Sequence, residues 1–199
     1  TTGVISMLRE NVVTDTEVLF LEGYLFDPPA AQEAFKVAAR LARDAGRKVA
    51  VTLSDPFCVE RHRAAFVDLV DHHVDVVVAN RDELCSLYET DDINEAHRIV
   101  ADRCPMAVVT HGPDGSLVLT GDQTGRVAAE PVANVVDTTG AGDQYAAGFF
   151  YGLATGLDLE TCGRLGSIAA AEVISHLGAR PQVSLAELAA PALAGRNQG

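Results

Sequence analysis

The sequence predicts an α/β protein built on a mostly parallel sheet with helices on both faces. Three observations lead to this fold class. Short apolar runs recur along the chain, segments with helical spacing lie between them, and turn residues separate the two kinds of segment. Strands that alternate with crossover helices form parallel sheets. With 199 residues, 48% of them hydrophobic, the chain can bury one sizeable core, so we expect one domain over residues 1–199.

Apolar runs at five places are expected to be strands. They lie at residues 18–21, 49–53, 74–79, 106–110 and 116–120, and a further short strand is expected around residues 126–129. The turn sequence 112–115 is expected to reverse the chain into a hairpin. Residues 1–15 show no clear period. In a parallel sheet the carboxyl ends of the strands meet at one edge, where ligands bind, so the segments that follow these runs are the candidates for a site.

The clearest helix follows the first strand. Asp27 is expected to cap it, Pro28 to take its first position and Gly46 to end it. Asp92 with Glu95 is expected to form a capping box. Further helices are expected at residues 59–71, 80–88, 92–103, 141–155 and 158–176, and the tail from residue 191 is expected to fray.

Composition excludes several partners. A net charge of −13 and a pI near 4.7 argue against binding a nucleic-acid backbone or an anionic membrane. The four cysteines show no metal-binding spacing and are expected to be reduced core thiols, as in cytoplasmic proteins. No apolar run approaches the ~20 residues that a membrane span needs. We therefore expect a cytoplasmic protein that binds small molecules.

The stretch Asp137-Thr138-Thr139-Gly140-Ala141-Gly142-Asp143 is the strongest candidate site. Its glycines leave the backbone bare where a helix begins, and free N–H groups there form an anion site. Asp143 could take a proton from a hydroxyl while these N–H groups hold a phosphoryl group. A glycine turn with an ordinary helix-start aspartate explains the spacing equally well. The stretch is neither a Walker A loop nor a Rossmann fingerprint, since Tyr145 replaces the third glycine.

At this stretch, together with Ala146-Ala147-Gly148-Phe149, the chain resembles the C-terminal signature of the PfkB/ribokinase family of carbohydrate and nucleoside kinases. The resemblance implies a ribokinase-like three-layer fold, with ATP as co-substrate and Mg²⁺. It implies that Asp143 is the catalytic base and that Gly140, Ala141 and Gly142 form the anion hole. The resemblance runs from about Val18 to Arg180. The family's N-terminal part, with the acceptor site and a small β-sheet lid, has no counterpart here.

Other segments carry weaker parts of the same resemblance. Asn80-x-x-Glu83 is similar to the family's N-x-x-E motif, which implies contacts to Mg²⁺, partly through water, and to the phosphates; an Asn cap with an acidic first turn is the structural alternative. Thr110-x-Gly112-x-x-Gly115 resembles the nucleotide-binding turn, although any hairpin could show it. Asp137 and Thr139 match positions beside a monovalent-cation site, for example for K⁺, but Asp137 could be only a turn former.

Glycine and alanine line two consecutive helices, at residues 148, 152 and 156 and at 163, 166 and 169–171. Close helix packing explains this pattern, and the alternative is space for a purine ring near Gly166 and Ser167, which only the resemblance supports. Leu53-Ser54-Asp55-Pro56-Phe57 resembles the L-S-x-P-F of adenosine kinases, so Phe57 could stack on a substrate base.

The function that follows is an ATP-dependent phosphotransferase acting on a sugar hydroxyl, most of all that of adenosine or a related nucleoside. Another PfkB-type sugar kinase, a non-catalytic nucleotide-binding fragment and an unrelated α/β binding protein stay open. The expected partners are ATP and a nucleoside or sugar, and an open sheet edge would favour a homodimer.

Overall fold

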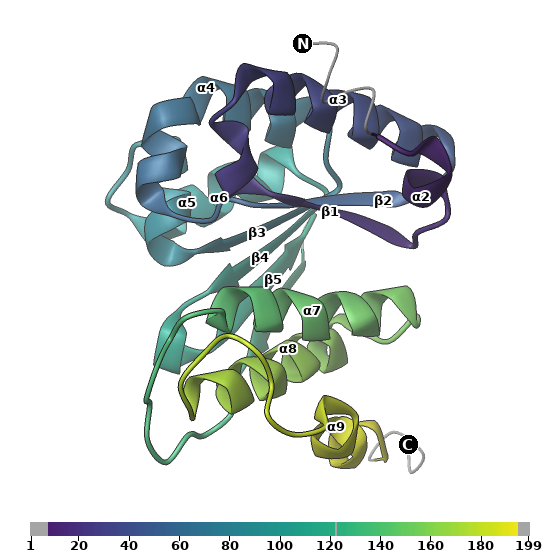
Figure 1. Cartoon of the computed structure of the whole chain (residues 1–199). Helices are drawn as coiled ribbons and strands as arrows, with labels where there is room; N and C mark the ends of the chain where they lie inside the picture. Colours follow the sequence, from purple (N-terminus) through teal and green to yellow (C-terminus); the bar gives the residue numbers. More distant parts are fainter. Residues whose placement is uncertain (1–7, 122, 195–199) are drawn as a thin grey trace. The chain divides into compact units, whose positions relative to one another are not determined.

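The computed structural model describes residues 8–121 and 123–194. Six strands form one sheet in the order β1-β2-β3-β4-β5-β6 (Figure 1). β1 (Val18–Glu22), β2 (Lys48–Thr52) and β3 (Val76–Asn80) pair in parallel. They are followed by β4 (Met106–Thr110), β5 (Ser116–Thr120) and β6 (Gln123–Val127). The α/β class with a mostly parallel sheet is therefore confirmed.

Eight α-helices and two short 3₁₀ helices are present in the described residues. The α-helices are α2 (Glu10–Thr14), α3 (Pro29–Asp44), α4 (Pro56–His72), α5 (Arg81–Tyr88), α6 (Ile93–Arg103), α7 (Ala141–Ala154), α8 (Leu159–Ile174) and α9 (Leu185–Ala194), and the 3₁₀ helices are η1 (Gly23–Phe26) and η2 (Gly112–Asp114). None of the described helices is long and apolar enough to cross a membrane. The four cysteines form no disulfide in the described part of the chain; Cys58, Cys104 and Cys162 are buried in the core, as expected, while Cys85 is half-buried.

The chain divides into two compact units. The first runs to Val109 and also takes in Leu119–Gln123, and the second combines Thr110–Val118 with the chain from Thr124 onward. Each unit is described by itself below. The single domain expected over residues 1–199 stays a prediction.

In the first unit, strand order follows chain order. Because crossovers between parallel strands are right-handed, the helices that link β1, β2, β3 and β4 lie on one face of these strands, and α3 and α4 are seen over β1 and β2 in Figure 1. Their core is aromatic: Phe26 of η1 stacks on Phe66 of α4 with ring centroids 4.5 Å apart, and Phe35 of α3 meets its edge at 5.0 Å. Aromatic pairs of this kind contribute about 0.5–1.5 kcal/mol beyond the area they bury.

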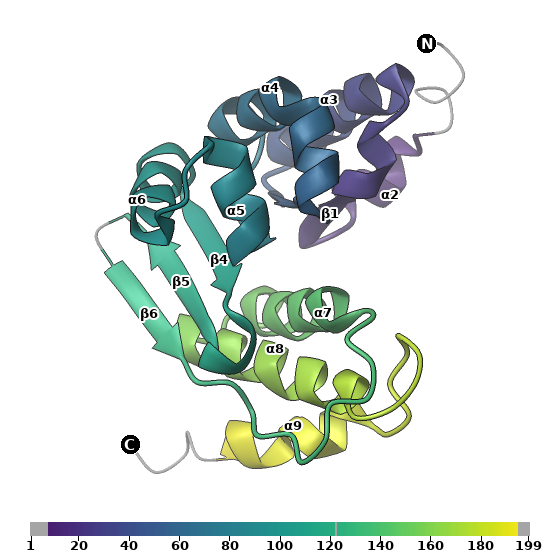
Figure 2. The ribbon, with the colours of Figure 1, turned by 90° about the vertical axis from the view of Figure 1, so that its left-hand side faces the viewer.

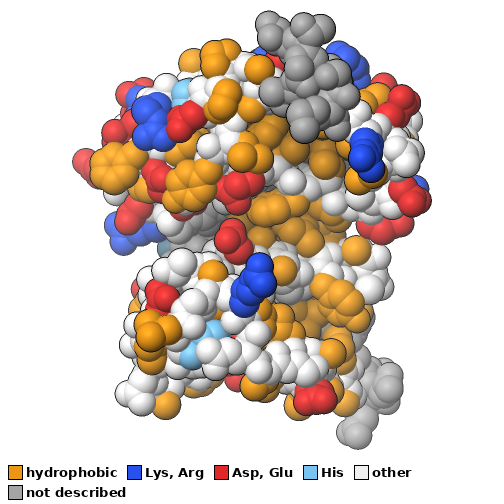
Figure 3. Space-filling model, viewed as in Figure 1, with side chains coloured by type: hydrophobic (Ala, Val, Ile, Leu, Met, Phe, Trp, Pro, Cys, Tyr) orange, Lys and Arg blue, Asp and Glu red, His pale blue; other side chains and the backbone are white. Residues whose placement is uncertain are grey.

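β1 lies at one end of the strand order, so one of its edges has no partner strand among the described residues. Its Leu21 is buried, whereas its neighbour Phe20 is 37% exposed on the opposite face. Apolar side chains are also visible on the surface in Figure 3. An open edge beside exposed apolar groups favours self-association. The homodimer nevertheless stays a prediction.

In the second unit, α7 and α8 pack through glycine. A Cβ added to Gly148 would lie 2.5 Å from the carbonyl oxygen of Leu165, and one added to Gly152 would lie 2.9 Å from Sγ of Cys162. Glycine in a helix interior costs roughly 1 kcal/mol relative to alanine, and here close approach of the two helices requires it. The close-packing interpretation of these glycines is confirmed.

The structure corrects the predicted start of α3. Pro28 is the N-cap and Pro29 the first helical residue, so Asp27 does not cap the helix. Instead, Oδ1 of Asp27 lies 2.8 Å from Nε2 of His62, at the point where α4 departs from helical backbone angles. Asp27 therefore joins η1 to α4, an interaction that local sequence cannot reveal.

The predicted capping box of α6 is also wrong. Asp92 accepts from the amide of Asn94, but Glu95 binds the hydroxyl of Thr90 at 2.6 Å, and the same hydroxyl accepts from the amide of Asp92 at 3.2 Å. Thr90 supplies the acceptor that Glu95 was expected to supply, so the N-terminal donors are satisfied in a different way.

Several boundaries differ from the predictions. The helix expected at 59–71 begins at Pro56, and the strand expected at 126–129 lies at 123–127. Of the tail that was expected to fray, residues 191–194 belong to α9, and residues 195–199 lie outside the described residues. α2 was not anticipated, because five residues are too few to show a period. Residues 1–7 of the N-terminal stretch lie outside the described residues.

Candidate active site

The Asp137–Asp143 loop opens α7 as expected. Gly140 is the N-cap, with φ +80°, and a Cβ there would lie 2.6 Å from Cβ of Ala179. Both the left-handed backbone and the close approach require glycine at this position. A Cβ on Gly142, in contrast, would meet nothing within 4 Å. The space beside Gly142 is therefore open to a ligand.

The first turn of α7 has donors without partners. The amide of Ala141 binds the carbonyl oxygen of Thr138 at 3.2 Å, whereas the amides of Gly142 and Asp143 have no acceptor among the described residues. Asp143 is exposed and no cation lies against it in the described part of the chain. An exposed carboxylate beside free amides at the positive end of a helix is the combination that the base-and-anion-hole interpretation needs. These roles stay predictions.

Asp137 holds the other end of the loop. Its Oδ1 accepts from the amide of Thr139 at 2.9 Å and its Oδ2 accepts from the amide of Gly178 at 3.0 Å. These bonds, that of the Thr139 amide first, hold the pKa of the Asp137 carboxyl below its usual range. The turn-forming role of Asp137 is thus real, while a cation site at Asp137 and Thr139 stays a prediction.

The other predicted parts of the second unit meet at Tyr145 of α7. Its hydroxyl lies 2.6 Å from Oγ of Ser116, which follows the turn Gly112–Gly115. A Cβ on Gly163 would approach its hydroxyl to 3.3 Å, and one on Gly166 would approach its carbonyl oxygen to 2.7 Å. Tyr145 is 5% exposed. It joins the predicted nucleotide turn, the predicted catalytic helix and α8, a role that the sequence did not reveal.

The predicted nucleotide-binding residues have clear structural surroundings. Thr110 ends β4, and Gly112 and Gly115 have φ of +58° and +88°. A Cβ on Gly115 would lie 2.0 Å from the carbonyl oxygen of Val127, so this glycine is required by packing. Ser167 is buried, and its hydroxyl accepts from the amide of Glu130 at 2.7 Å. A purine near Gly166 and Ser167 and a nucleotide at the turn stay predictions.

In the first unit, Asn80 and Glu83 form a complete capping box at the start of α5. Oδ1 of Asn80 accepts from the amide of Glu83, and the Glu83 carboxylate accepts from the amide and from Nδ2 of Asn80, at 2.7–2.9 Å. The structural alternative for this motif is therefore confirmed. Burial, together with the negative charges of Asp55 and Glu22, raises the pKa of Glu83 to about 7, although the hydrogen bond from the Asn80 backbone amide lowers it.

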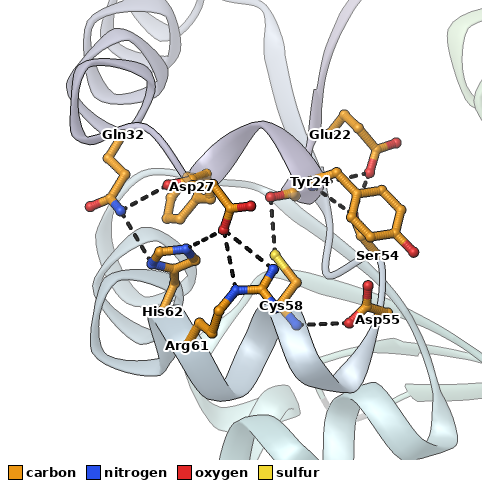
Figure 4. Close-up of polar contacts among 11 residues, drawn as sticks. Glu22, Tyr24, Asp27, Gln32, Ser54, Asp55, Cys58, Arg61 and His62 are labelled. Carbon is orange, nitrogen blue, oxygen red and sulfur yellow. Dashed lines mark hydrogen bonds and ion pairs between the residues drawn. The ribbon is translucent and has the colours of Figure 1, made fainter.

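Hydrogen bonds join the segments at the carboxyl ends of β1 and β2 (Figure 4). The Ser54 hydroxyl donates a short hydrogen bond to Oε1 of Glu22 and accepts from the amide of Tyr24 at 3.1 Å. Ser54 has φ +71°, and a Cβ on Gly23 would lie 2.7 Å from its Oγ. A non-glycine residue in this region costs on the order of 1–3 kcal/mol, a strain typical of functional sites. Nothing in the local sequence predicts it.

Tyr24 and Phe57 stand at the same edge. Phe57, the second residue of α4, is 71% exposed, and Tyr24 is 55% exposed. Burial, with the Asp55 carboxylate beside it, raises the pKa of the Tyr24 phenol to about 12. Asp55 itself caps α4 through the amide of Cys58 at 2.7 Å. An exposed phenyl ring is free to take a ligand, and the substrate role of Phe57 stays a prediction.

In the two described ranges, 8–121 and 123–194, no three His, Cys, Asp or Glu side chains gather closely enough to hold a metal ion by themselves. Mg²⁺ commonly keeps several waters and few protein ligands. The Glu83 carboxylate, whose oxygens each accept one hydrogen bond and keep a lone pair, fits such a partial ligand set.

Solved structures resemble the chain closely. A probable sugar kinase from Rhizobium etli CFN 42 is 47% identical with a TM-score of 0.92, covering 94% of this chain and 57% of that one. Adenosine kinase from Sinorhizobium meliloti is 45% identical with a TM-score of 0.89, covering 98% and 58%. A putative ribokinase II from E. coli, in complex with ATP and Mg²⁺, has a TM-score of 0.84 at 17% identity, covering 96% and 63%. This last likeness shows the ribokinase-like fold alone.

Curated relatives named 5-dehydro-2-deoxygluconokinase also match the chain. A 5-dehydro-2-deoxygluconokinase from Geobacillus thermodenitrificans (strain NG80-2) is 30% identical over 178 residues, which are 84% of this chain and 52% of the relative. The chain thus spans about half the length of this relative. The family described as pfkB family carbohydrate kinase matches residues 6–185. On this match, and with the fold and the motifs described above, the chain belongs to the pfkB family of carbohydrate kinases.

Proposed function

We propose that this chain is the nucleotide-binding and catalytic part of an ATP-dependent kinase that phosphorylates a sugar hydroxyl, with adenosine or a related nucleoside as the acceptor. The observation that carries the proposal is the start of α7. There Asp143 is exposed beside the unpartnered amides of Gly142 and Asp143, and a Cβ on Gly142 would meet nothing. A base and an anion site within one helical turn suit transfer of a phosphoryl group to a hydroxyl.

In the proposed reaction the Asp143 carboxylate takes the proton of the acceptor hydroxyl. The hydroxyl oxygen forms a bond to the terminal phosphorus of ATP as the bond from that phosphorus to the ADP oxygen breaks. In the anion hole proposed for Gly140, Ala141 and Gly142, the unpartnered amides of Gly142 and Asp143 donate to the transferring phosphoryl group, where they offset its charge without having to reorganise. General-base catalysis of this kind contributes typically ~10²–10⁴-fold.

Bound Mg²⁺ would supply positive charge to the phosphates, and Glu83, with Asn80, is the group proposed to position it, in part through water. The turn Thr110–Gly115 with Gly166 and Ser167 is proposed to face the nucleotide. Asp137 and Thr139 are proposed to adjoin a monovalent cation such as K⁺. A homodimer and a cytoplasmic location remain part of the proposal.

The acceptor is proposed from two observations. The L-S-D-P-F segment leaves Phe57 71% exposed, with Tyr24 at the same edge of the first unit, so aromatic faces are available for a base. The 45% identical Sinorhizobium meliloti protein is an adenosine kinase. A sugar or sugar-acid acceptor is the second candidate, which the 5-dehydro-2-deoxygluconokinase relatives favour. A nucleotide-binding fragment without catalysis is the third, because relatives are nearly twice as long.

The test is a coupled ADP-release assay on the complete protein that contains this chain. Adenosine, inosine, ribose, fructose and 5-dehydro-2-deoxygluconate are compared at equal concentration with Mg·ATP, and a reaction without acceptor is the blank. We expect the highest kcat/KM with adenosine. ADP release that no acceptor raises above the blank contradicts the proposal. Calorimetry of the 199-residue chain with Mg·ATP then shows whether it binds nucleotide.

A further inference from the structure

The segment that follows α8 supports the Asp137–Gly140 loop (Figure 2). The amide of Gly178 donates to Oδ2 of Asp137 at 3.0 Å. A Cβ added to Gly140 would lie only 2.6 Å from the Cβ of Ala179. The carbonyl oxygen of Ala179 accepts from Nε2 of Gln144 at 3.4 Å. The loop that carries the predicted anion hole is thus shaped by Gly178 and Ala179, which lie about forty positions later in the chain.

One buried carboxylate holds both ends of this segment. The side chain of Glu172, in the last turn of α8, is 6% exposed. Its Oε1 lies 3.1 Å from Nε2 of His176 and accepts from the amide of Gln182 at 2.8 Å. His176 precedes Gly178 and Gln182 follows it, so the carboxylate closes the segment into a loop around its contact with Asp137.

The His176 ring lies between two hydrogen-bond acceptors. Its Nδ1 lies 3.2 Å from the carbonyl oxygen of Leu177, while its Nε2 faces Glu172. A carbonyl oxygen and a carboxylate can only accept, so both contacts are hydrogen bonds when both ring nitrogens carry protons. The two bonds then join an imidazolium to a buried carboxylate, and charge-assisted bonds are the stronger and more directional kind.

Glu172 is a poor choice for stability alone. Its Oε2 is buried and has no hydrogen-bond partner in the described part of the chain. A buried carboxylate with an unsatisfied oxygen is costly, and this cost offsets part of the stability that the two interactions of Oε1 contribute. What the carboxylate supplies is therefore a fixed loop rather than a more stable fold.

We propose that Glu172 is a positioning residue for the catalytic loop, which it holds in shape through His176, Gln182 and the Gly178–Asp137 bond. The proposal rests on the proposed function insofar as the loop is catalytic. Its structural part, that the Glu172 carboxylate keeps the 176–182 segment on Asp137, can be tested on the chain itself.

The test compares Glu172→Met with Glu172→Gln and Val173→Ala. Methionine fills the volume but accepts no hydrogen bond, glutamine keeps an acceptor, and Val173, fully buried on the next position of α8, is a control for lost stability. Amide hydrogen exchange at Gly178, Thr139 and Gln182 is measured in the 199-residue chain, with Tm. Glu172→Met is expected to speed exchange at all three amides by ~10-fold or more, and by more than Val173→Ala does at a comparable loss of Tm. Glu172→Gln should stay near the parent, and Val173→Ala should lower Tm.

In the complete kinase, Glu172→Met is expected to lower kcat by ~10–100-fold while KM for ATP changes by less than ~3-fold, because a displaced loop affects the reacting geometry most. Unchanged exchange at Gly178 and Thr139 would overturn the inference. So would a parallel loss of Tm and activity like that of Val173→Ala. If the parent protein releases no ADP with any acceptor, the proposed function fails, and the exchange comparison still decides the role of Glu172.

Discussion

Two regions of the molecule carry carboxylates that could serve the same reaction, yet they shift the carboxyl pKa in opposite directions. At the strand ends of the first unit, burial raises the pKa of Glu83 to about 7, with Asp55 and Glu22 nearby. In the loop of the second unit, the amides of Thr139 and Gly178 lower the pKa of Asp137. Acids crowded together disfavour the charge, whereas backbone donors favour it. The first region therefore suits a cation, and the second suits an acid that stays ionised.

The largest expected effect tests the second region. Asp143→Asn in the complete kinase should lower kcat by ~10²–10⁴-fold, because the amide cannot accept the hydroxyl proton, while Mg·ATP affinity stays within a few-fold. Steady-state ADP release and calorimetry measure the two quantities. Since Asp143 is exposed, the variant should keep the parent's Tm. A near-normal kcat would remove Asp143 from the role of base.

Gly140 and Gly142 provide a matched pair in the same loop. Gly142→Val places its side chain in open space, so we expect a folded protein whose kcat/KM for ATP falls by at least ~10-fold, because the side chain fills the site of the phosphoryl group. Gly140→Ala meets a φ of +80° and the Cβ of Ala179, so it should lower the free energy of unfolding by ~1–3 kcal/mol.

Urea unfolding and ADP release separate the two glycine variants. If Gly142→Val has the same steady-state constants as the parent, the expected difference between the two variants is absent. That result would mean that no ligand approaches the Gly142 amide.

Glu83→Gln tests the first region through pH. The pKa of Glu83 is about 7 in the folded protein and 4.5 in the unfolded chain. Between pH 4.5 and pH 7, therefore, Glu83 is protonated in the folded protein and ionised in the unfolded chain. The contribution of protonated Glu83 to the free energy of unfolding is fully present below pH 4.5 and is lost as the pH rises through 7. Without Mg²⁺, the glutamine variant should therefore be more stable than the parent at pH 8, by on the order of 2 kcal/mol, with little difference at pH 4.5.

Urea midpoints across this pH range measure the Glu83 effect. A difference that is independent of pH would show that the Glu83 carboxyl titrates normally, and the contrast between the two regions would then be lost.

The smallest expected effect concerns Tyr24. Tyr24→Phe removes the phenol beside Asp55 but keeps the ring, and because Tyr24 is 55% exposed we expect less than ~1 kcal/mol of change in the free energy of unfolding. KM for adenosine should also change little if the ring face alone meets the base. A loss of acceptor affinity beyond ~10-fold would show that the hydroxyl itself contacts the substrate.

Contiguous signals were predicted well from the sequence. The five apolar runs became strands and the Asn80–Glu83 cap formed, because each depends on residues close together in the chain. The start of α7 at Ala141 was placed correctly for the same reason.

What the sequence could not provide was pairing across the chain. Asp27 contacts His62 instead of capping α3, and Ser54 has a left-handed backbone where it contacts Glu22 and Tyr24. In the sequence, Tyr145 was noted only because it replaces the third glycine of a Rossmann fingerprint. In the structure it contacts Ser116 after the predicted nucleotide turn and Gly163 and Gly166 of α8. In each case a tertiary contact decided between local possibilities of similar energy.

The contact between α7 and α8 has a consequence for how the molecule opens. Gly148 approaches the main chain of Leu165 and Gly166, and Gly152 approaches Cys162, so at these two positions no long side chain separates the helices. The Tyr145 ring, which does lie against Gly163 and Gly166, is buried and has little room to change rotamer. A displacement of one helix must carry the other. Their interior amides should therefore exchange as one cooperative unit, with equal opening free energies, even when the ends fray. Helix α7, which carries Asp143 in its first turn, therefore moves together with α8. Independent thermal motion of this first turn has to come from the loop that precedes it.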